Sequence, residues 1–210
     1  QEVMASASHI FAPRADYRFR TITSPSTTYD DPTTGEDPPY GASLNYFLKV
    51  PAAQAPVLTI LDAQGTTVRT LQGTNVAGIN RVAWDLRDEP GVEVRLRTSP
   101  MYAPYIAVPP EGRVAPSTGR VSLLVAPGTY TVKLSVGGAE QTRQLEVRKD
   151  PNTAGTVAEV EAQLRMLAAL RIDMNAGAGA VHRIESVRVQ LDVLKRTVTD
   201  AEVTRAATAL

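Results

Sequence analysis

The feature that most constrains this chain is a series of short segments between residues 41 and 149 in which apolar and polar residues alternate. In "NRVAWDLR", Val82, Trp84 and Leu86 alternate with small or charged residues. Because successive side chains of a strand point to opposite faces, this period of two predicts strands with one buried face. Turn sequences separate the segments, as in an antiparallel β-sandwich. The other predicted strands are "SLNYFLK", "PVLTILD", "TTVRTLQ", "VEVRLR", "GRVSLLVA", "PGTYTVKLSV" and "QTRQLEVRK".

The period changes to that of a helix in the last part of the chain, residues 151–210. Thr156 and Glu159 have the spacing of a capping box at a helix start. The sequence "NAGAGA" at 175–180 predicts a break, so we expect two amphipathic helices that form an antiparallel hairpin. Their apolar stripes are Val160, Leu164, Leu167 and Met174 in the first helix, and Ile184, Val187, Leu191, Leu194 and Val198 in the second.

Two segments lack both periods. Residues 1–40 are rich in Thr, Ser, Pro and Asp after a short apolar patch, which predicts an extended N-terminal arm or linker. Residues 98–119 form a long loop with five prolines inside the predicted sandwich, and such loops are often functional. The predicted organisation is therefore an arm at 1–40, a sandwich at 41–150 and a helical hairpin at 151–210.

Composition restricts the possible functions. The formal net charge is zero, so nothing indicates binding to nucleic acid or to an anionic membrane surface. The chain has no cysteine, which excludes disulfides and thiolate chemistry. It has no apolar run of the length that crosses a bilayer. Because it begins at Gln1, we expect that a leader or a larger N-terminal part precedes it.

The candidate reactive groups are better explained as structural residues. A strand places Asp85 on the face opposite Trp84, so Trp84 is predicted to anchor the core together with Tyr130, and Asp85 to lie in a solvated ladder of charges. His9 and His182 lack the converging partners of a metal site. The acidic sequence "YDDPTTGED" lacks the ligand order of calcium loops. No nucleophile or phosphate-binding motif occurs. We therefore expect a protein without enzymatic activity, metal or cofactor.

The residues that look functional are aromatic or apolar and lie outside the strand pattern. Such side chains on proline-stiffened segments suit protein interfaces, because little conformational entropy is lost when they dock. The alternative is that both segments pack back on their own sandwich as a lid. The candidate interface residues are Ile10, Phe11, Tyr17 and Phe19 in the arm, and Met101, Tyr102, Tyr105 and Ile106 in the loop.

The order of several motifs resembles a known family. The pieces are "HIFAPR", "PPYGASLNYFLK", "ILDAQGTTVRTLQGTNVAGINRVAWDLR", "APGTYTVKLSVGG" and "LEVRKDP". Together they resemble the C-terminal region of bacterial sortilin-like β-propeller proteins of the VPS10 and Asp-box type. The resemblance implies an Ig-like or fibronectin-III-like sandwich followed by a helical hairpin. It supplies no catalytic residues, because the propeller repeats are missing and no Asp-box occurs.

These observations favour a structural subunit that bridges or caps components of an extracytoplasmic assembly. Its expected partners are other protein subunits, for example at the periplasmic face of a bacterial membrane complex. One alternative is an accessory or carbohydrate-binding module of a secreted propeller hydrolase. Another is a peptide-binding sandwich that uses an open edge strand.

Overall fold

A computed structural model describes residues 2–19, 39–100, 102–115 and 120–209. The chain divides into two compact units, of which the first comprises residues 1–89 and 122–165. The second comprises residues 90–121 and 166–210. Each unit is described below by itself.

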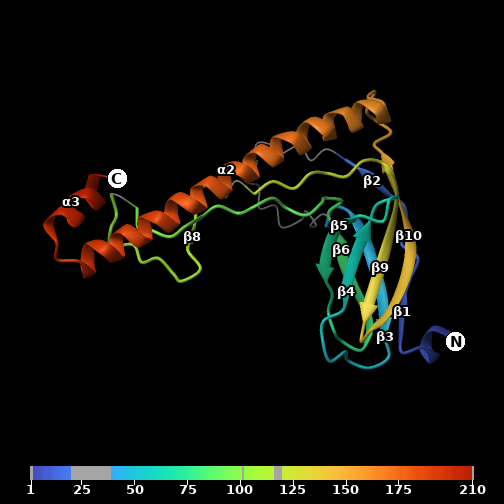
Figure 1. The fold of residues 1–210 in the computed structure, drawn as a ribbon. Helices are drawn as coiled ribbons and strands as arrows, with labels where there is room; N and C mark the ends of the chain where they lie inside the picture. Colours follow the sequence, from blue (N-terminus) through green and yellow to red (C-terminus); the bar gives the residue numbers. More distant parts are fainter. Residues whose placement is uncertain (1, 20–38, 101, 116–119, 210) are drawn as a thin grey trace, which may run out of the picture. The chain divides into compact units, whose positions relative to one another are not determined.

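The first unit is built from two β-sheets (Figure 1). A short helix, α1 (Glu2–Ala5), precedes them. The smaller sheet has the order β1-β3-β6 and the larger the order β2-β10-β9-β4-β5. All strand pairs are antiparallel except β2 with β10. The strands are β1 (Ser8–Ile10), β2 (Asp16–Arg18), β3 (Ala42–Leu48), β4 (Val57–Leu61), β5 (Thr67–Gln72), β6 (Gly78–Trp84), β9 (Gly128–Val136) and β10 (Ala139–Lys149). The prediction of a mainly β protein is confirmed.

Both sheets contribute side chains to one hydrophobic core, and Trp84 and Tyr130 lie in it as predicted. Trp84 is fully buried, and its ring meets that of Tyr130 edge to face at a centroid distance of 5.6 Å. The indole Nε1 donates a hydrogen bond to the Arg87 carbonyl (2.8 Å), and the Tyr130 hydroxyl donates one to the Ala126 carbonyl (2.8 Å). The polar atoms of both rings are therefore satisfied, which makes their burial favourable. Trp84 belongs to the scaffold.

Tyr130 should make the stability of the protein depend on alkaline pH. Burial raises the pKa of Tyr130 to about 12, and the charge of Asp62 adds to this while that of Arg18 opposes it. Since the folded pKa lies above the unfolded one, this contribution to stability is complete below about pH 10 and is lost between about pH 10 and 12. The expected loss is about 1.4 kcal/mol per pH unit. Chemical unfolding of the wild type and of Tyr130→Phe from about pH 9 to 12 measures it. Equal losses in the two proteins would contradict the prediction.

Several predicted strands and the predicted arm differ from the structure. The first half of the arm is not free, because residues 8–10 and 16–18 pair with β3 and β10. Residues 20–38, with the acidic sequence, lie outside the described part. The strand that was expected to extend to Arg87 ends at Trp84. Two residues later, Leu86 adopts a left-handed backbone conformation with a φ of 56°. In "GRVSLLVA", the residues that the structure describes, 120–126, form a single bridge, between Leu124 and Arg87.

The second unit contains most of the helical part of the chain. Helix α2 (Val157–Thr197) is followed by α3 (Ala201–Ala209), and strands β7 (Arg95–Leu96) and β8 (Arg113–Val114) pair with each other. "VEVRLR" therefore contributes two residues to a separate ribbon and none to the sheets of the first unit. Among the described residues, no helix is long and apolar enough to cross a membrane.

The predicted start of α2 is confirmed. The hydroxyl of Thr156 accepts a hydrogen bond from the Glu159 N–H (3.2 Å), and the Glu159 carboxylate accepts one from the Thr156 N–H (2.7 Å). These are the reciprocal bonds of a capping box. Hydrogen bonds from the backbone and side chain of Thr156 lower the pKa of Glu159.

The predicted break at Asn175–Ala180 is wrong, because α2 runs continuously through it. The two antiparallel helices predicted for this region are one helix. Each of its two glycines, Gly177 and Gly179, costs about 1 kcal/mol relative to alanine in a helix interior. That cost is small beside the contacts that α2 makes at this point. Asn175 lies inside α2 and accepts a hydrogen bond from the Val92 N–H of an extended segment, so it does not cap a helix end.

Candidate functional site

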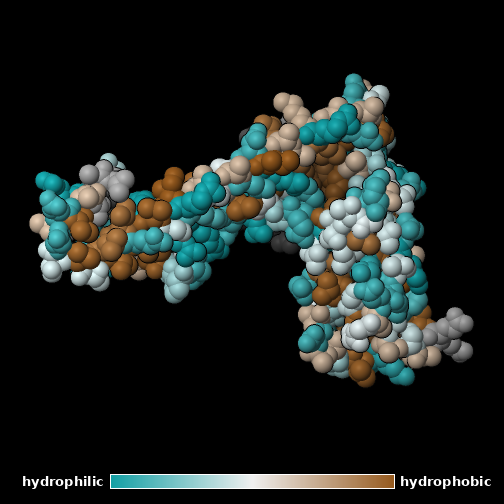
Figure 2. Space-filling view, viewed as in Figure 1, coloured by the Kyte–Doolittle hydropathy of each residue, from teal (hydrophilic) through white to brown (hydrophobic). Residues whose placement is uncertain are grey.

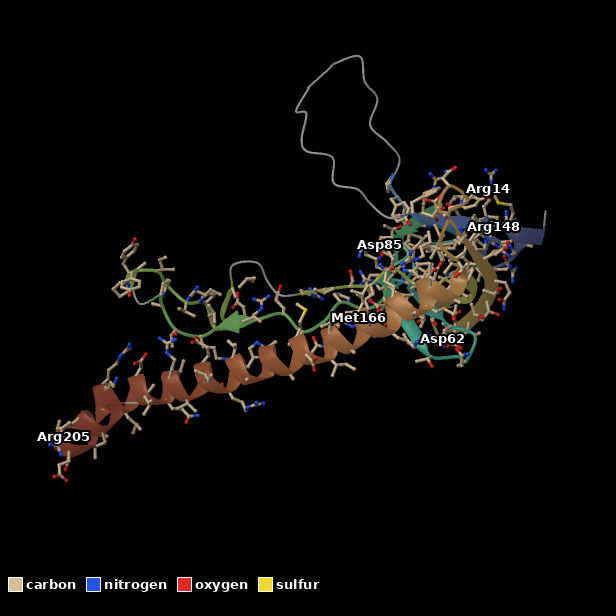
Figure 3. The ribbon with its side chains drawn as sticks, turned by 90° about the horizontal axis from the view of Figure 1, so that it is seen from above. Arg14, Asp62, Asp85, Arg148, Met166 and Arg205 are labelled. Atoms are coloured by element: carbon tan, nitrogen blue, oxygen red, sulfur yellow. The ribbon has the colours of Figure 1, made fainter. Side chains whose placement is uncertain are left out.

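In the second unit, an extended segment is fastened along one face of α2. We call residues 91–98 the strap. The side-chain oxygen of Asn175 accepts a hydrogen bond from the Val92 N–H (2.8 Å), and Nε2 of His182 accepts one from the Arg95 N–H (3.1 Å). The segment runs beside α2 in two perpendicular views (Figures 1 and 3). Helix side chains thus satisfy strap N–H groups that a neighbouring strand would bind in a sheet.

Glu185 makes the densest contact with the strap. One of its carboxylate oxygens accepts hydrogen bonds from the Arg97 N–H (2.7 Å), the Thr98 N–H (3.0 Å) and the Thr98 hydroxyl (2.9 Å). The other oxygen forms an ion pair with Arg188 at 2.7 Å. The side chain of Glu185 is almost fully buried. Burial raises its pKa, but the hydrogen bonds from Thr98 and Arg97 and the charge of Arg188 outweigh burial, and the pKa is lowered.

The helical period explains why these groups share one face. His182 follows Asn175 by seven residues and Glu185 follows His182 by three, which are spacings that return to the same side of a helix. Ala178 lies between them and is only 4% exposed. Gly91 lets the strap approach closely, since a Cβ there would lie 2.7 Å from the Asn175 side-chain oxygen. Small residues on both elements allow the contact.

The strap leads into a loop that presents two tyrosines. We call residues 99–112 the loop tip. The Ala103 N–H bonds to the Pro100 carbonyl (3.0 Å), and the Ile106 N–H bonds to the Ala103 carbonyl (3.1 Å), which gives two successive turns. Tyr102 is 93% exposed and Tyr105 is 85% exposed. The rings of both tyrosines therefore gain almost no burial from their own chain.

The base of the loop tip is closed by bonds between its two limbs. Nε of Arg113 donates to the Thr98 carbonyl (3.0 Å), and Nη1 of Arg95 donates to the Gly112 carbonyl (3.3 Å). The Ala115 N–H donates to the Val94 carbonyl (3.1 Å). Thr98 is therefore fixed both to Glu185 of α2 and to the returning limb. This arrangement holds the loop tip on the helix.

The eight candidate interface residues have different environments. In the loop, Tyr102, Tyr105 and Ile106 are exposed, and Met101 lies outside the described residues. In the arm, Ile10 is buried in the core of the first unit, which differs from the prediction, because β1 pairs with β3 and turns it inward.

The arm aromatics contact one another or nearby rings. The ring of Phe11 contacts that of His9 edge to face at 5.1 Å. Tyr17 stacks on Phe19 at 5.8 Å, and the Phe19 N–H donates a hydrogen bond to the hydroxyl of Tyr40 (2.8 Å). The arm aromatics thus contact rings of their own unit, with Phe19 still 40% exposed, whereas the two loop tyrosines are far more exposed.

Metal-ligand clusters and surface grooves are the other candidate sites in the described part of the chain. Within them, no group of three or more His, Cys, Asp or Glu side chains could hold a metal ion. A shallow groove in the first unit is lined by Asp16, Ser43 and Arg81. The Asp16 carboxylate accepts a hydrogen bond from the Tyr17 N–H (2.7 Å), and Nε of Arg81 donates one to the Asn45 side chain (3.0 Å). These bonds tie both charged groups to the protein itself.

Sequence reasoning missed the role of Asn175, His182 and Glu185. The signal is a second face of α2 with alternating spacings of four and three, formed by Arg171, Asn175, Ala178, His182, Glu185 and Val189. Polar residues in such a register have no obvious partner in the sequence. Their partners are backbone groups of the strap, and backbone groups leave no mark in an amino-acid sequence.

Comparison of the chain with protein-family models, curated proteins and solved structures finds no match. Its function therefore has to be inferred from the geometry described above.

Proposed function

We propose that this chain is a non-enzymatic protein-interaction subunit that bridges or caps components of a larger extracytoplasmic assembly. The observation that carries the proposal is the exposure of Tyr102 and Tyr105, at 93% and 85%, on a loop tip with a hydrogen-bonded base. Tyrosine is enriched in protein interfaces and in their energetic hot spots. A side chain held in place before binding loses little conformational entropy when it docks.

The loop tip is organised before any partner arrives. The Ser99 hydroxyl donates to the Ile106 carbonyl (2.8 Å) across the tip, and Pro104 stiffens the backbone between the two tyrosines. Glu185 fixes Thr98 at the base of the tip. These bonds hold the backbone around the two tyrosines before binding, which supports a docking role.

We propose further that the first unit is an Ig-like or fibronectin-III-like sandwich that serves as a platform. Strand β6 pairs with β3, and β4 pairs with β9 as well as with its sequence neighbour β5, so the chain crosses between the sheets as in a Greek key. Near the start of β9, the hydroxyl of Tyr130 bonds back to the Ala126 carbonyl. This bond has the form of the tyrosine corner of Ig-like sandwiches.

The extracytoplasmic location is part of the proposal and rests on the sequence. The absence of cysteine fits a bacterial periplasmic protein, and the motif order resembles that of sortilin-like proteins. The proposed partners are other protein subunits, including those at the periplasmic face of a membrane complex.

Replacing both loop tyrosines with serine should release the partners without unfolding the chain. The double variant Tyr102→Ser/Tyr105→Ser removes two exposed rings, and we expect at least about a tenfold loss of co-purifying subunits, which corresponds to about 1.4 kcal/mol of binding free energy. The measurement is gentle purification from the native host followed by quantitative mass spectrometry.

The matched control is Val50→Ser/Val76→Ser, because these side chains are 65% and 62% exposed in the first unit. The control should retain the partners, and both variants should keep the wild-type thermal midpoint. Retention of all partners by the tyrosine variant would contradict the proposal. So would recovery of the wild type solely as a free monomer.

A further inference from the structure

The face of α2 opposite the strap carries an exposed apolar seam. Ile184 is 59% exposed, Val187 53% and Leu194 42%, while Leu191 is half-buried. Brown, hydrophobic atoms recur along the part of the molecule built on α2 (Figure 2). At the same spacing, the preceding positions toward the start of the helix are Ala180, Gly177 and Asp173, so the apolar seam begins at Ile184.

The geometry of a helix places this seam opposite the strap. Ile184 lies nine residues after Asn175, and Leu194 lies nine residues after Glu185. Nine residues are about two and a half turns, so each residue of such a pair points away from the other. Asn175 and Glu185 bind the strap, so the seam faces away from it. The strap cannot cover the seam.

The spacing of the seam is that of a coiled coil. Ile184, Val187, Leu191 and Leu194 follow one another at intervals of three, four and three, which are the a and d positions of a heptad. Such a seam is narrower than the wide apolar face with which amphipathic helices lie on lipid. The shape of the surface therefore suits another helix better than a membrane.

The charges beside the seam select the kind of helix. Arg183 occupies a g position, and Arg188 and Lys195 occupy e positions, while the remaining flanking positions over this stretch carry Gln190 and Thr197. In a parallel pair of two copies, Arg183 would face Arg188 of the other copy, and in an antiparallel pair Arg188 would face Lys195. Like charges at these positions oppose pairing, so self-association is disfavoured.

We propose that this seam binds an amphipathic helix of another protein that carries acidic residues at its e and g positions. The proposal rests on the docking function proposed above and adds a second surface to it, separate from the loop tip. Apolar side chains of the partner would fill the seam, and its carboxylates would pair with Arg183 and Lys195, while Arg188 keeps its ion pair with Glu185.

The test uses two synthetic peptides of four heptads with Leu and Ile at a and d. One carries Glu at every e and g position and the other carries Lys. We expect the full-length protein to bind the acidic peptide at least about tenfold more tightly than the basic one, with the preference weakened by salt. Calorimetry or fluorescence anisotropy measures both affinities. Equal affinities, or no binding of the acidic peptide, would overturn the proposal.

Variants identify the surface. Ile184→Glu/Val187→Glu should abolish binding while the fold is retained, because both side chains are exposed. Arg183→Glu/Lys195→Glu should reverse the preference toward the basic peptide, and it leaves the ion pair of Arg188 with Glu185 intact. The loop variant Tyr102→Ser/Tyr105→Ser should bind the acidic peptide as the wild type does, which separates this surface from the loop tip. An unchanged preference in the charge-reversal variant would overturn the proposal.

Two other occupants would also overturn it. Sedimentation that shows a dimer dissociated by Ile184→Glu/Val187→Glu would assign the seam to a second copy of this chain. Co-sedimentation with vesicles that contain anionic lipid, lost in the same variant and without binding of the acidic peptide, would assign it to a membrane surface.

Discussion

Replacing Gly41 with alanine is expected to destabilise the first unit by at least about 3 kcal/mol, which is a large part of the stability of a typical domain. Gly41 has a φ of +108°, and a Cβ there would lie 2.0 Å from the carbonyl oxygen of Trp84. The Cβ is fixed to the backbone of residue 41, and the oxygen belongs to the backbone of Trp84, so no side-chain rotation can separate them. The chain would have to shift where Ala42 pairs with Trp84 and would open the pairing of β3 with β6. Urea unfolding measures the change.

Gly65 provides a matched control for Gly41. It also has a positive φ, +79°, but a Cβ there would meet no atom within 4 Å. Gly65→Ala should therefore cost only the backbone penalty of a left-handed conformation, about 1 to 2 kcal/mol. A Gly41→Ala protein no less stable than Gly65→Ala would mean that the contact with Trp84 does not set the geometry of this corner.

Replacing Glu185 with alanine should detach the strap from α2. The substitution removes the acceptor of three hydrogen bonds, from the N–H groups of Arg97 and Thr98 and from the Thr98 hydroxyl. Hydrogen bonds to a charged group contribute about 1.5 to 3 kcal/mol each, so a local loss of about 3 kcal/mol is a conservative expectation. Amide hydrogen exchange at residues 97 and 98 should become at least about 100-fold faster.

A control on the same helix distinguishes loss of the Glu185 bonds from a general effect of removing a charge from α2. Asp192→Ala, which removes an exposed acid of the same helix, should leave the exchange of the strap unchanged. Because the pKa of Glu185 is lowered in the folded protein, its contribution is present at neutral pH and disappears as the pH falls through that lowered pKa. Residues 97 and 98 of the wild type should therefore lose protection as the pH falls through the lowered pKa of Glu185, and the same two residues of Glu185→Ala should not change over that range. Protection of residues 97 and 98 at the wild-type level in Glu185→Ala would contradict this account of the strap.

The strands of the first unit could be predicted because their information is local. In β3, β6 and β9 the buried residues alternate in the sequence, and the buried pair of Trp84 and Tyr130 follows from that alternation. The capping box at Thr156 is equally local, since both of its residues lie within one turn. Strand alternation and a capping box both depend on neighbouring residues alone, so both can be recognised in the sequence.

The strapped helix could not be predicted, because its determinants lie far apart in the chain. "VEVRLR" alternates like a strand of a sheet, but the partner of its backbone is a helix face more than 80 residues away. "NAGAGA" reads as a break because glycine weakens isolated helices. In the structure α2 continues through this segment: Ala178 is buried, the Asn175 side chain lies against Gly91 of the strap, and a Cβ at Gly177 would meet no atom within 4 Å. The predicted break is wrong, because the hydrogen bonds between α2 and the strap are tertiary contacts that the local sequence does not show.

The burial of part of the N-terminal arm could not be predicted from its sequence either. "HIFAPR" contains too few residues to show a period, so it reads as a free segment. Ile10 is nevertheless buried, because β1 forms the edge strand of the smaller sheet. The backbone N–H of Ile10 also donates a hydrogen bond to the side chain of Gln141 (3.0 Å). In contrast, both loop tyrosines are exposed in the structure. Among the described residues of their unit, none covers Tyr102 or Tyr105.

The most direct test of the docking function is site-specific photo-crosslinking in the native host. A photoreactive phenylalanine analogue replaces Tyr102 or Tyr105 in turn, and Val50 serves as the control position because it is 65% exposed in the first unit. The account predicts that positions 102 and 105 crosslink to the same discrete protein in high yield and that position 50 does not. Uncrosslinked monomer at all three positions, or the same weak background at each, would contradict it.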